Sequence, residues 1–145
     1  MSSPTIAQHA GVLLCLGLLS ANSGAAGNPT ETDADAGERL MLSDRYPEAV
    51  TAFRRALVAD PDSAPLHARL ARALAEDEDL DGAVRAYERT VALAPADADS
   101  RTRLAIILTR LDRFEEALAN LEIAVELVPD HAWAYDVLGK LHFRE

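Results

Sequence analysis

Three prolines of this chain stand 34 residues apart, and their spacing constrains the fold more than any other feature of the sequence. Pro61, Pro95 and Pro129 each follow an alanine-rich amphipathic stretch. A fixed period of this length is typical of supersecondary units stacked side by side. Stacked units present an extended surface to partners rather than an enclosed pocket for chemistry. The spacing therefore predicts a repeat protein.

Alignment on these prolines gives three full units and a partial fourth, and each unit repeats one alternation of small and large side chains. The full units are 30–63, 64–97 and 98–131, and the partial unit is 132–145. Each unit has a small residue 12 positions before its proline, a bulky residue 8 positions before it and another small residue 5 positions before it. In the same order these residues are Ala49, Ala83, Ala117; Phe53, Tyr87, Leu121; and Ala56, Thr90, Ala124. A further position of the repeat is always a small residue: Gly37, Ala71, Ala105 and Gly139. Two close-packed helices require this alternation, because small residues let backbones approach and large ones fill the groove opposite.

Each unit is predicted to be a helix, a turn and a second helix. Apolar residues recur at threes and fours, the period of an α-helix, and the second helix should end before its proline, which lacks an N–H donor. Turns are expected at 42–46, 78–80 and 112–114. Pro47 suits the first turn of a helix. The residues expected to cap helix N-termini are Ser63, Asp97 and Asp130.

The pattern resembles the tetratricopeptide repeat family over residues 30–145. The matching positions are Gly37, Ala49, Phe53, Ala56 and Pro61; Leu70, Ala71, Ala83, Tyr87 and Pro95; Leu104, Ala105, Ala117, Leu121, Ala124 and Pro129; Leu138 and Gly139. The family's aromatic residue near the start of the first helix is replaced by Asp33, His67 and Arg101, and returns only as Tyr135. The resemblance implies an all-α solenoid of antiparallel helix pairs that serves as a scaffold or adaptor for protein interactions. An ordinary helical bundle is the rival fold, but a bundle needs no 34-residue register.

The first 29 residues do not belong to the array. They contain no Asp, Glu, Lys or Arg, and an apolar run at 10–19 is followed by small and polar residues. This arrangement resembles a secretory signal peptide, with a mature start expected between Gly24 and Asn28. We therefore expect a periplasmic or secreted protein; an uncleaved membrane anchor and an unstructured leader are the alternatives. Cys15 lies inside the apolar run and follows Leu14, which argues against a lipoprotein.

The chemical inventory argues against catalysis, a metal site and a cofactor. His67 and His142 fall at helix positions expected to face packing partners, and His131 lies at a unit boundary. No two histidines are one helical turn apart, and no glycine-rich phosphate loop occurs. Within the array Ser43, Ser63 and Ser100 fall at turn or cap positions, so none is expected to be a nucleophile activated by a base. The net charge of −10 disfavours nucleic acid as a partner. The sequence therefore predicts a protein that is not an enzyme.

In the family that the chain resembles, the first helix of each unit lines a concave groove. The offsets that face this groove hold acidic residues in unit one, Asp35 and Glu38, and mixed charges in the partial fourth, Asp136 and Lys140. The two middle units hold arginines: Arg69, Arg72, Arg103 and Arg110. These four arginines and Lys140 are the predicted binding site for a protein or peptide, possibly acidic, that occupies the groove. The other interpretation is that the arginines only solvate an exposed face and pair with neighbouring acids.

Some family members grip the carboxyl terminus of a chaperone through lysines and asparagines at defined offsets. Here those offsets hold Ala34, Glu38, Arg69, Asp99 and Arg103, and only Arg103 fits. A different peptide or a folded partner is therefore expected.

Residues 132–145 match a first helix without its second. Tyr135, Leu138, Leu141 and His142 are expected to cover the third unit, and Trp133, Val137 and Phe143 to lie near a rim. Trp133 and Phe143 would form an apolar edge. Such an edge marks either a binding surface or the cut end of a longer protein, for example a docking module of an enzyme that continues past Glu145. A membrane-anchored assembly factor is the other alternative.

Overall fold

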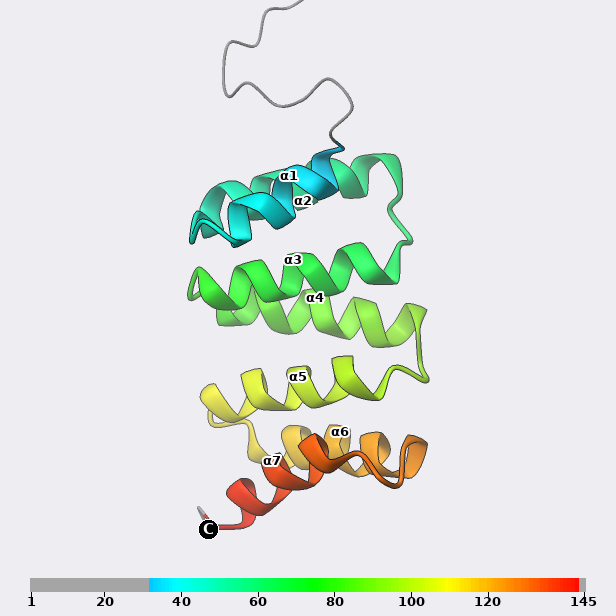
Figure 1. The fold of residues 1–145 in the computed structure, drawn as a ribbon. Coiled ribbons are helices and arrows are strands. Elements are labelled where there is room, and N and C mark those ends of the chain that lie inside the picture. The colour runs from blue at the N-terminus through cyan, green and yellow to red at the C-terminus, as the bar shows by residue number, and fades with distance from the viewer. Residues whose placement is uncertain (1–31, 144–145) are drawn as a thin grey trace, which may run out of the picture.

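The computed structural model describes residues 32–143, and within this range the chain forms seven α-helices and no strand (Figure 1). The helices are α1 (Asp33–Met41), α2 (Tyr46–Ala59), α3 (Ala64–Glu76), α4 (Leu80–Leu93), α5 (Ala98–Arg110), α6 (Phe114–Leu127) and α7 (Ala132–His142). The predicted all-α solenoid of three helix pairs and one further helix is confirmed. The expected leader, 1–29, lies outside the described residues. None of the described helices has the length and apolarity needed to cross a membrane.

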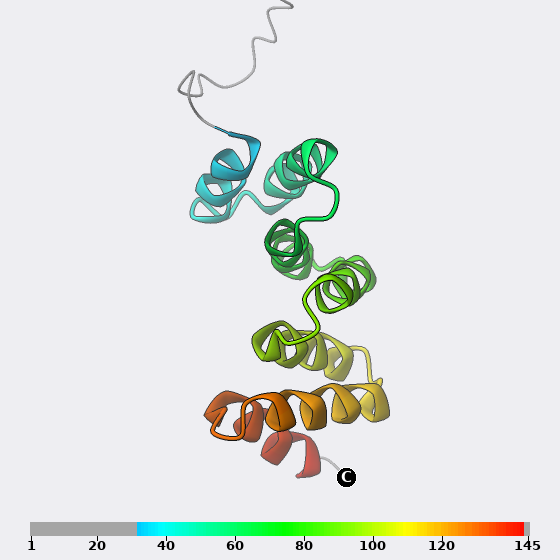
Figure 2. The same cartoon turned by 90° about the vertical axis from the view of Figure 1, so that its right-hand side faces the viewer.

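The helices pack as consecutive antiparallel pairs. α1 packs on α2, α3 on α4 and α5 on α6, while α2·α3, α4·α5 and α6·α7 contacts join the pairs into one stack. The pairs also turn about the stacking direction: α3 and α4 are seen nearly end-on in Figure 2, whereas α6 is seen lengthwise. α7 contacts α5 as well as α6, so the last described helix closes over the third pair.

The alternation of small and large residues forms the core of each pair. Ala49, Ala83 and Ala117 are fully buried, and so are the bulky residues that follow them, with Phe53 and Leu121 at 0% and Tyr87 at 2% exposure. In the first pair the contact is so close that a Cβ built on Gly37 would lie 2.6 Å from Cε1 of Phe53. A glycine at this position of α1 is therefore what allows the Phe53 ring to fill the space between α1 and α2.

The helix ends follow the sequence signals with one exception. α2, α4 and α6 end at Ala59, Leu93 and Leu127, two residues before each proline. The Asp97 carboxylate accepts a hydrogen bond from the backbone N–H of Ser100 at 3.0 Å, as an N-cap should. Ser63 is an N-cap by position but makes no side-chain cap hydrogen bond. Asp130 was a wrong prediction: it lies in the turn before α7, and His131 occupies the cap position.

The turns inside the three pairs share one backbone conformation. Asp44, Glu78 and Asp112 lie 34 residues apart and have φ angles of 55°, 63° and 57°, in the left-handed region. Aspartate tolerates this conformation better than most residues, and glutamate tolerates it less well. The repeat therefore extends to turn geometry, which confirms the three predicted turns.

Candidate functional site

The five predicted groove cations all lie exposed on one face, which we call the first-helix face because α1, α3, α5 and α7 form it. Arg69 and Arg72 project from α3, Arg103 and Arg110 from α5, and Lys140 from α7. The first helices α3, α5 and α7 thus carry exposed cations, and their role as a binding site stays a prediction.

Three of these cations form ion pairs, two with acids of α1 and α7 and one with Glu78 in the turn between α3 and α4. Nε of Arg69 lies 3.3 Å from Oε1 of Glu38, Nη2 of Arg110 lies 2.8 Å from Oε2 of Glu78, and Nζ of Lys140 lies 2.6 Å from Oδ2 of Asp136. Arg72 makes no ion pair with any described residue. All of these side chains are exposed, and exposed pairs contribute little to stability. These ion pairs therefore add little to the stability of the fold.

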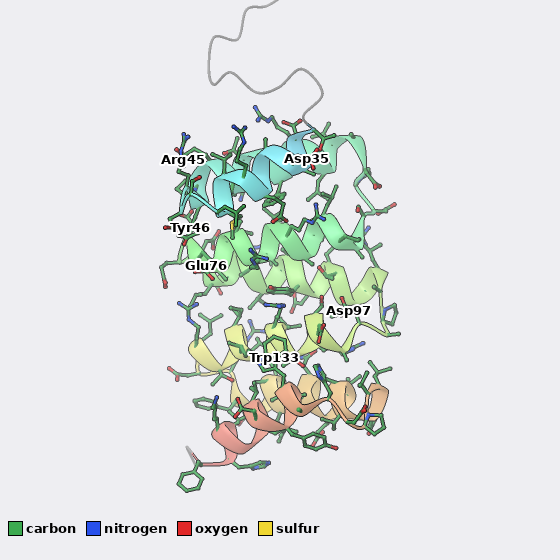
Figure 3. All side chains as sticks on the ribbon, viewed as in Figure 1. Asp35, Arg45, Tyr46, Glu76, Asp97 and Trp133 are labelled. Carbon is green, nitrogen blue, oxygen red and sulfur yellow. The ribbon has the colours of Figure 1, made fainter. Side chains whose placement is uncertain are left out.

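Arg103 and Trp133 form a second kind of contact on this face. The guanidinium carbon of Arg103 lies 4.9 Å from the centroid of the Trp133 ring, within the range of a cation–π interaction. Figure 3 shows the Trp133 side chain lying between α7 and α5. The indole thus joins the two first helices, and the exposed Arg103 side chain lies over its ring.

A hollow of about 320 Å³, which we call the Trp133 hollow, opens beside this contact between α5 and α7. Its apolar lining comes from Ile106, Trp133, Val137 and Leu141, and its polar lining from Thr109, Arg110, Asp136 and Lys140. It therefore combines apolar walls with two of the predicted groove cations. The sequence placed Trp133 at an edge, so this combination was not predicted.

His131 fixes α7 against α5 next to the hollow. Its Nε2 lies 3.2 Å from Oδ1 of Asp99 and 3.3 Å from Oγ1 of Thr102. The Thr102 hydroxyl already donates to the carbonyl of Ala98 at 2.9 Å, so its oxygen must accept from His131, and Nε2 carries the proton. The ring also meets Trp133 edge-on, with centroids 6.2 Å apart. His131 thus positions the indole, which fits the structural role expected at a unit boundary.

The core connects to the first-helix face through Tyr87. Burial raises the pKa of the Tyr87 phenol, while the positive charges of Arg103 and Arg72 act in the opposite direction. The phenol therefore stays neutral in the physiological range. The two arginines act on the same buried phenol although they come from adjacent first helices.

The remaining histidines do not form a site. Nε2 of His67 lies 2.9 Å from the carbonyl oxygen of Pro61, a contact that holds the turn before α3. His142 is exposed, contrary to the expectation that it faces a packing partner, although it borders a small hollow with Phe114, Glu115 and Leu118 of α6. Among the described residues no three potential ligands gather in a geometry that would hold a metal ion.

The predicted apolar edge divides into two places. Trp133 is partly covered on the first-helix face, whereas Phe143 is 97% exposed at the end of α7. Tyr135, which was expected to cover the third unit, is 50% exposed instead, and Ala134 and Leu141 supply the buried contacts of α7. A second hollow of about 410 Å³, the Gly139 hollow, is lined by Tyr135, Asp136, Gly139, Lys140 and Phe143.

Two family models, both described as tetratricopeptide repeat, match residues 35–98 and 74–141. Together they span 35–141, and the chain belongs to the tetratricopeptide repeat family. Members of this family are generally non-catalytic modules for protein interaction.

Solved structures share the fold at low sequence identity. The first repeat domain of Spaghetti (RPAP3), bound to the HSP90 peptide SRMEEVD, is 23% identical with a TM-score of 0.73, over 77% of this chain and 89% of that one. The second repeat domain of human RPAP3, in complex with the HSP70 peptide SGPTIEEVD, is 22% identical with a TM-score of 0.73, over 77% and 92%. MamA is 21% identical with a TM-score of 0.72, over 76% of this chain and 64% of that one. No curated protein matches the chain.

Proposed function

We propose that this protein is an interaction scaffold whose first-helix face binds an acidic peptide segment with an apolar side chain in the Trp133 hollow. The observation that carries the proposal is the juxtaposition of apolar walls with Arg110 and Lys140 in one hollow, beside Arg103. A ligand with a carboxylate next to an apolar residue satisfies both features at once. The acidic, apolar peptides bound to the RPAP3 domains, which share this fold, support that ligand class.

The ligand is proposed to be an internal acidic segment rather than a free carboxyl terminus. Of the residues at the positions that bind a chaperone carboxyl terminus in some family members, only Arg103 is of a suitable type. A carboxylate in the middle of a peptide needs only the side chains of Arg72, Arg103 and Arg110, two of which lie within reach of the Trp133 ring and its hollow.

Fluorescence anisotropy with the labelled peptide SRMEEVD, in free-acid and carboxyl-amidated forms, tests this function. The two forms should bind alike, and the double variant Arg72→Glu/Arg103→Glu should bind about tenfold or more weakly, because both groups then repel the ligand. Raised salt should weaken binding to the unchanged protein. The matched control is Arg54→Glu/Arg85→Glu, which makes the same charge change on exposed positions of α2 and α4. Equal losses in both double variants, or binding that ignores salt, would place the ligand elsewhere.

We also propose that the scaffold works in the cell envelope after export. The uncharged apolar run at 10–19 and the small residues after it support this part of the proposal. Mass spectrometry of protein expressed in a bacterial host should find a chain that begins between Gly24 and Asn28. Intact Met1 recovered in the membrane fraction would instead support the membrane-anchored scaffold.

A further inference from the structure

Two of the five cations on the first-helix face, Arg72 and Arg103, form no ion pair with a carboxylate of the described residues. The other three are each paired with an acid, which offsets their charge. Arg103 instead lies over the Trp133 ring, a contact that leaves its N–H groups without a carboxylate acceptor. The uncompensated positive charge of this face is therefore concentrated on the adjacent first helices α3 and α5.

Both arginines act on the hydroxyl of Tyr87, which projects from α4. Phe53 and Leu121 occupy the same position of the repeat and are wholly apolar, so among the three only Tyr87 carries a polar atom. Burial raises the pKa of this phenol, and the positive charges of Arg103 and Arg72 lower it, which places both guanidinium groups near the ring oxygen.

The Tyr87 hydroxyl has a proton to donate but no acceptor for it among the described residues. Tyr87 is 2% exposed, and no described carbonyl or carboxylate accepts a hydrogen bond from it. Arginine carries donors only, so Arg103 cannot accept this proton either. The described chain holds no enclosed polar side-chain atom without a partner, so the hydroxyl is the part of Tyr87 that stays accessible. A nearly buried donor thus opens toward the two unpaired arginines.

The acids at the start of α5 do not compensate these groups. Asp97 also acts on the phenol, but its carboxylate accepts hydrogen bonds from the backbone N–H of Ser100 at 3.0 Å and from the Ser100 hydroxyl at 2.6 Å. Asp99 lies 3.2 Å from Nε2 of His131. Two guanidinium groups and one phenol are therefore three neighbouring donor groups for which the described residues supply no acceptor.

We propose that Arg72, Arg103 and the hydroxyl of Tyr87 bind the phosphate of a phosphoserine in the peptide ligand. The phosphoserine stands beside the residue that enters the Trp133 hollow, because Arg103 lies over the ring that lines this hollow. The proposal rests on the proposed function and deepens it. We call the whole surface, which consists of the two arginines, Arg110 and the Trp133 hollow, the acidic-peptide site.

Three properties of the donors favour a phosphate over a carboxylate. A phosphoserine carries a charge of about −1.5 to −2 at neutral pH, which matches two unpaired guanidinium groups, whereas a carboxylate matches one. A phosphate also offers three acceptor oxygens to the three donor groups, and a carboxylate offers two. Both cations are arginines, whose planar fork binds two oxygens of one phosphate. Arginine clusters are a recurring means of recognising phosphorylated peptides.

Fluorescence anisotropy with three labelled peptides that differ at one residue tests the proposal. They are SRMEEVD, SRMESVD and SRMESVD with its second serine phosphorylated, all amidated at the carboxyl end. The phosphoserine peptide should bind about tenfold more tightly than the glutamate peptide, because it adds charge and a further charge-assisted hydrogen bond. The serine peptide should bind most weakly. The ratio of phosphoserine to glutamate affinity is the quantity that the protein variants should change.

Two variants separate the arginines from the phenol. Arg72→Lys/Arg103→Lys keeps both charges but removes the planar forks, and it should lower the ratio to about threefold or less. Tyr87→Phe removes only the hydroxyl, and it should lower the ratio about two- to threefold through the loss of one hydrogen bond. Phenylalanine already occupies this position of the repeat as Phe53, so the fold should persist, and circular dichroism checks this in both variants.

Matched controls make the same changes away from the site. Arg54→Lys/Arg85→Lys alters exposed positions of α2 and α4. Tyr46→Phe removes a hydroxyl that donates to the Asp44 carboxylate at 2.7 Å, at the start of α2. Both controls should leave the ratio unchanged.

Failure of this proposal and failure of the proposed function give different results. Equal binding of the phosphoserine and glutamate peptides, or a ratio that survives both the lysine and the phenylalanine variants, would overturn this proposal and leave the acidic-peptide site standing. If none of the three peptides binds, the proposed function fails and this proposal fails with it. Inorganic phosphate at the concentration of the peptide should leave the phosphoserine peptide bound. Displacement at that concentration would also overturn the proposal, because the site would then bind a free anion rather than a phosphorylated residue.

Discussion

At the scale of single residues, the repeat lets two glycines be compared in the same register. Gly37 is buried beneath the Phe53 ring, and Gly139 faces an open hollow. The same residue type therefore has opposite surroundings, because among the described residues a second helix packs on Gly37 and none packs on Gly139. Position in the repeat alone would assign them one role.

Alanine at each glycine should move the free energy of unfolding in opposite directions. Gly37→Ala should destabilise the protein by about 1–3 kcal/mol, because the added methyl overlaps a fully buried ring that has no room to move. Gly139→Ala should stabilise it by up to about 1 kcal/mol, because the helix gains propensity and no atom is displaced. Urea unfolding followed by circular dichroism measures both. Equal effects of the two changes would mean that the Phe53 contact is not close-packed.

Glu78 is the residue that restrains Arg110, and its neutralisation should strengthen the acidic-peptide site. Glu78→Gln keeps the shape of the side chain but removes the charge that the Arg110 guanidinium now faces at 2.8 Å. Affinity for the SRMEEVD peptide should rise about two- to fivefold, in line with the small energy of an exposed pair. The control is Glu88→Gln, the same charge change at an exposed position of α4. An unchanged affinity would show that Arg110 does not contact the ligand.

At the scale of elements, α1 is the shortest described helix and depends on its N-terminal cap. Thr32 and Asp35 form a capping box: Oγ1 of Thr32 accepts from the Asp35 N–H at 3.1 Å, and the Asp35 carboxylate accepts from the Thr32 N–H at 3.2 Å and from its hydroxyl at 2.7 Å. The hydrogen bonds from the Thr32 side chain and backbone lower the pKa of Asp35 from its ordinary value of 3.8.

This shift makes the order of α1 depend on acid. A carboxyl group whose pKa is lowered by folding stabilises the folded state above its ordinary pKa, and that contribution is lost as the pH falls through the folded value. Hydrogen exchange should therefore show α1 amides losing protection below about pH 4, earlier than α4 amides. Asp35→Asn should reduce this pH dependence, because the carboxylate of the capping box is then absent. Equal acid sensitivity of α1 and α4 would contradict the role of the box.

Most elements could be predicted from the sequence because their signals are local. The proline positions indicate where α2, α4 and α6 end, and the periodic small and large residues indicate which helix faces pack. Both signals lie within a single 34-residue unit. Asp130 is not the cap because it lies one residue before the register of Ser63 and Asp97, which falls on His131. Tyr135 and His142 are exposed on α7, which has no second helix among the described residues. Repeat register assigns these residues the environment of a full unit, which α7 does not have.

At the scale of the whole molecule, the candidate site was only partly predictable. The exposure of the four arginines and Lys140 on α3, α5 and α7 agrees with helix geometry, and their role as a binding site stays a prediction. The partners Glu38 and Glu78 lie 31 and 32 residues before Arg69 and Arg110, and pairing over such distances depends on how units stack. The Trp133 hollow likewise depends on how α7 closes over α5.

The last prediction concerns the stack itself, since a stacked array does not lose stability equally along its length. The α3–α4 pair contacts both neighbouring pairs, whereas among the described elements the α1–α2 pair contacts only one. Truncating a fully buried large residue costs about 3–5 kcal/mol when the site cannot collapse. Tyr87→Ala should lower stability by about this amount across the array, because the pairs on both sides depend on α4.

Phe53→Ala should show a smaller global loss in the same experiment, since its cost is limited by the free energy of opening α1 and α2 alone. Hydrogen exchange should then show α1 and α2 unprotected while α4 to α6 keep their protection. Thermal unfolding provides the comparison between the two variants. A loss of stability in Tyr87→Ala that is equal to or smaller than the loss in Phe53→Ala would argue against nearest-neighbour coupling and in favour of a single cooperative bundle. Only in a stack does the effect of a substitution depend on the position of its unit.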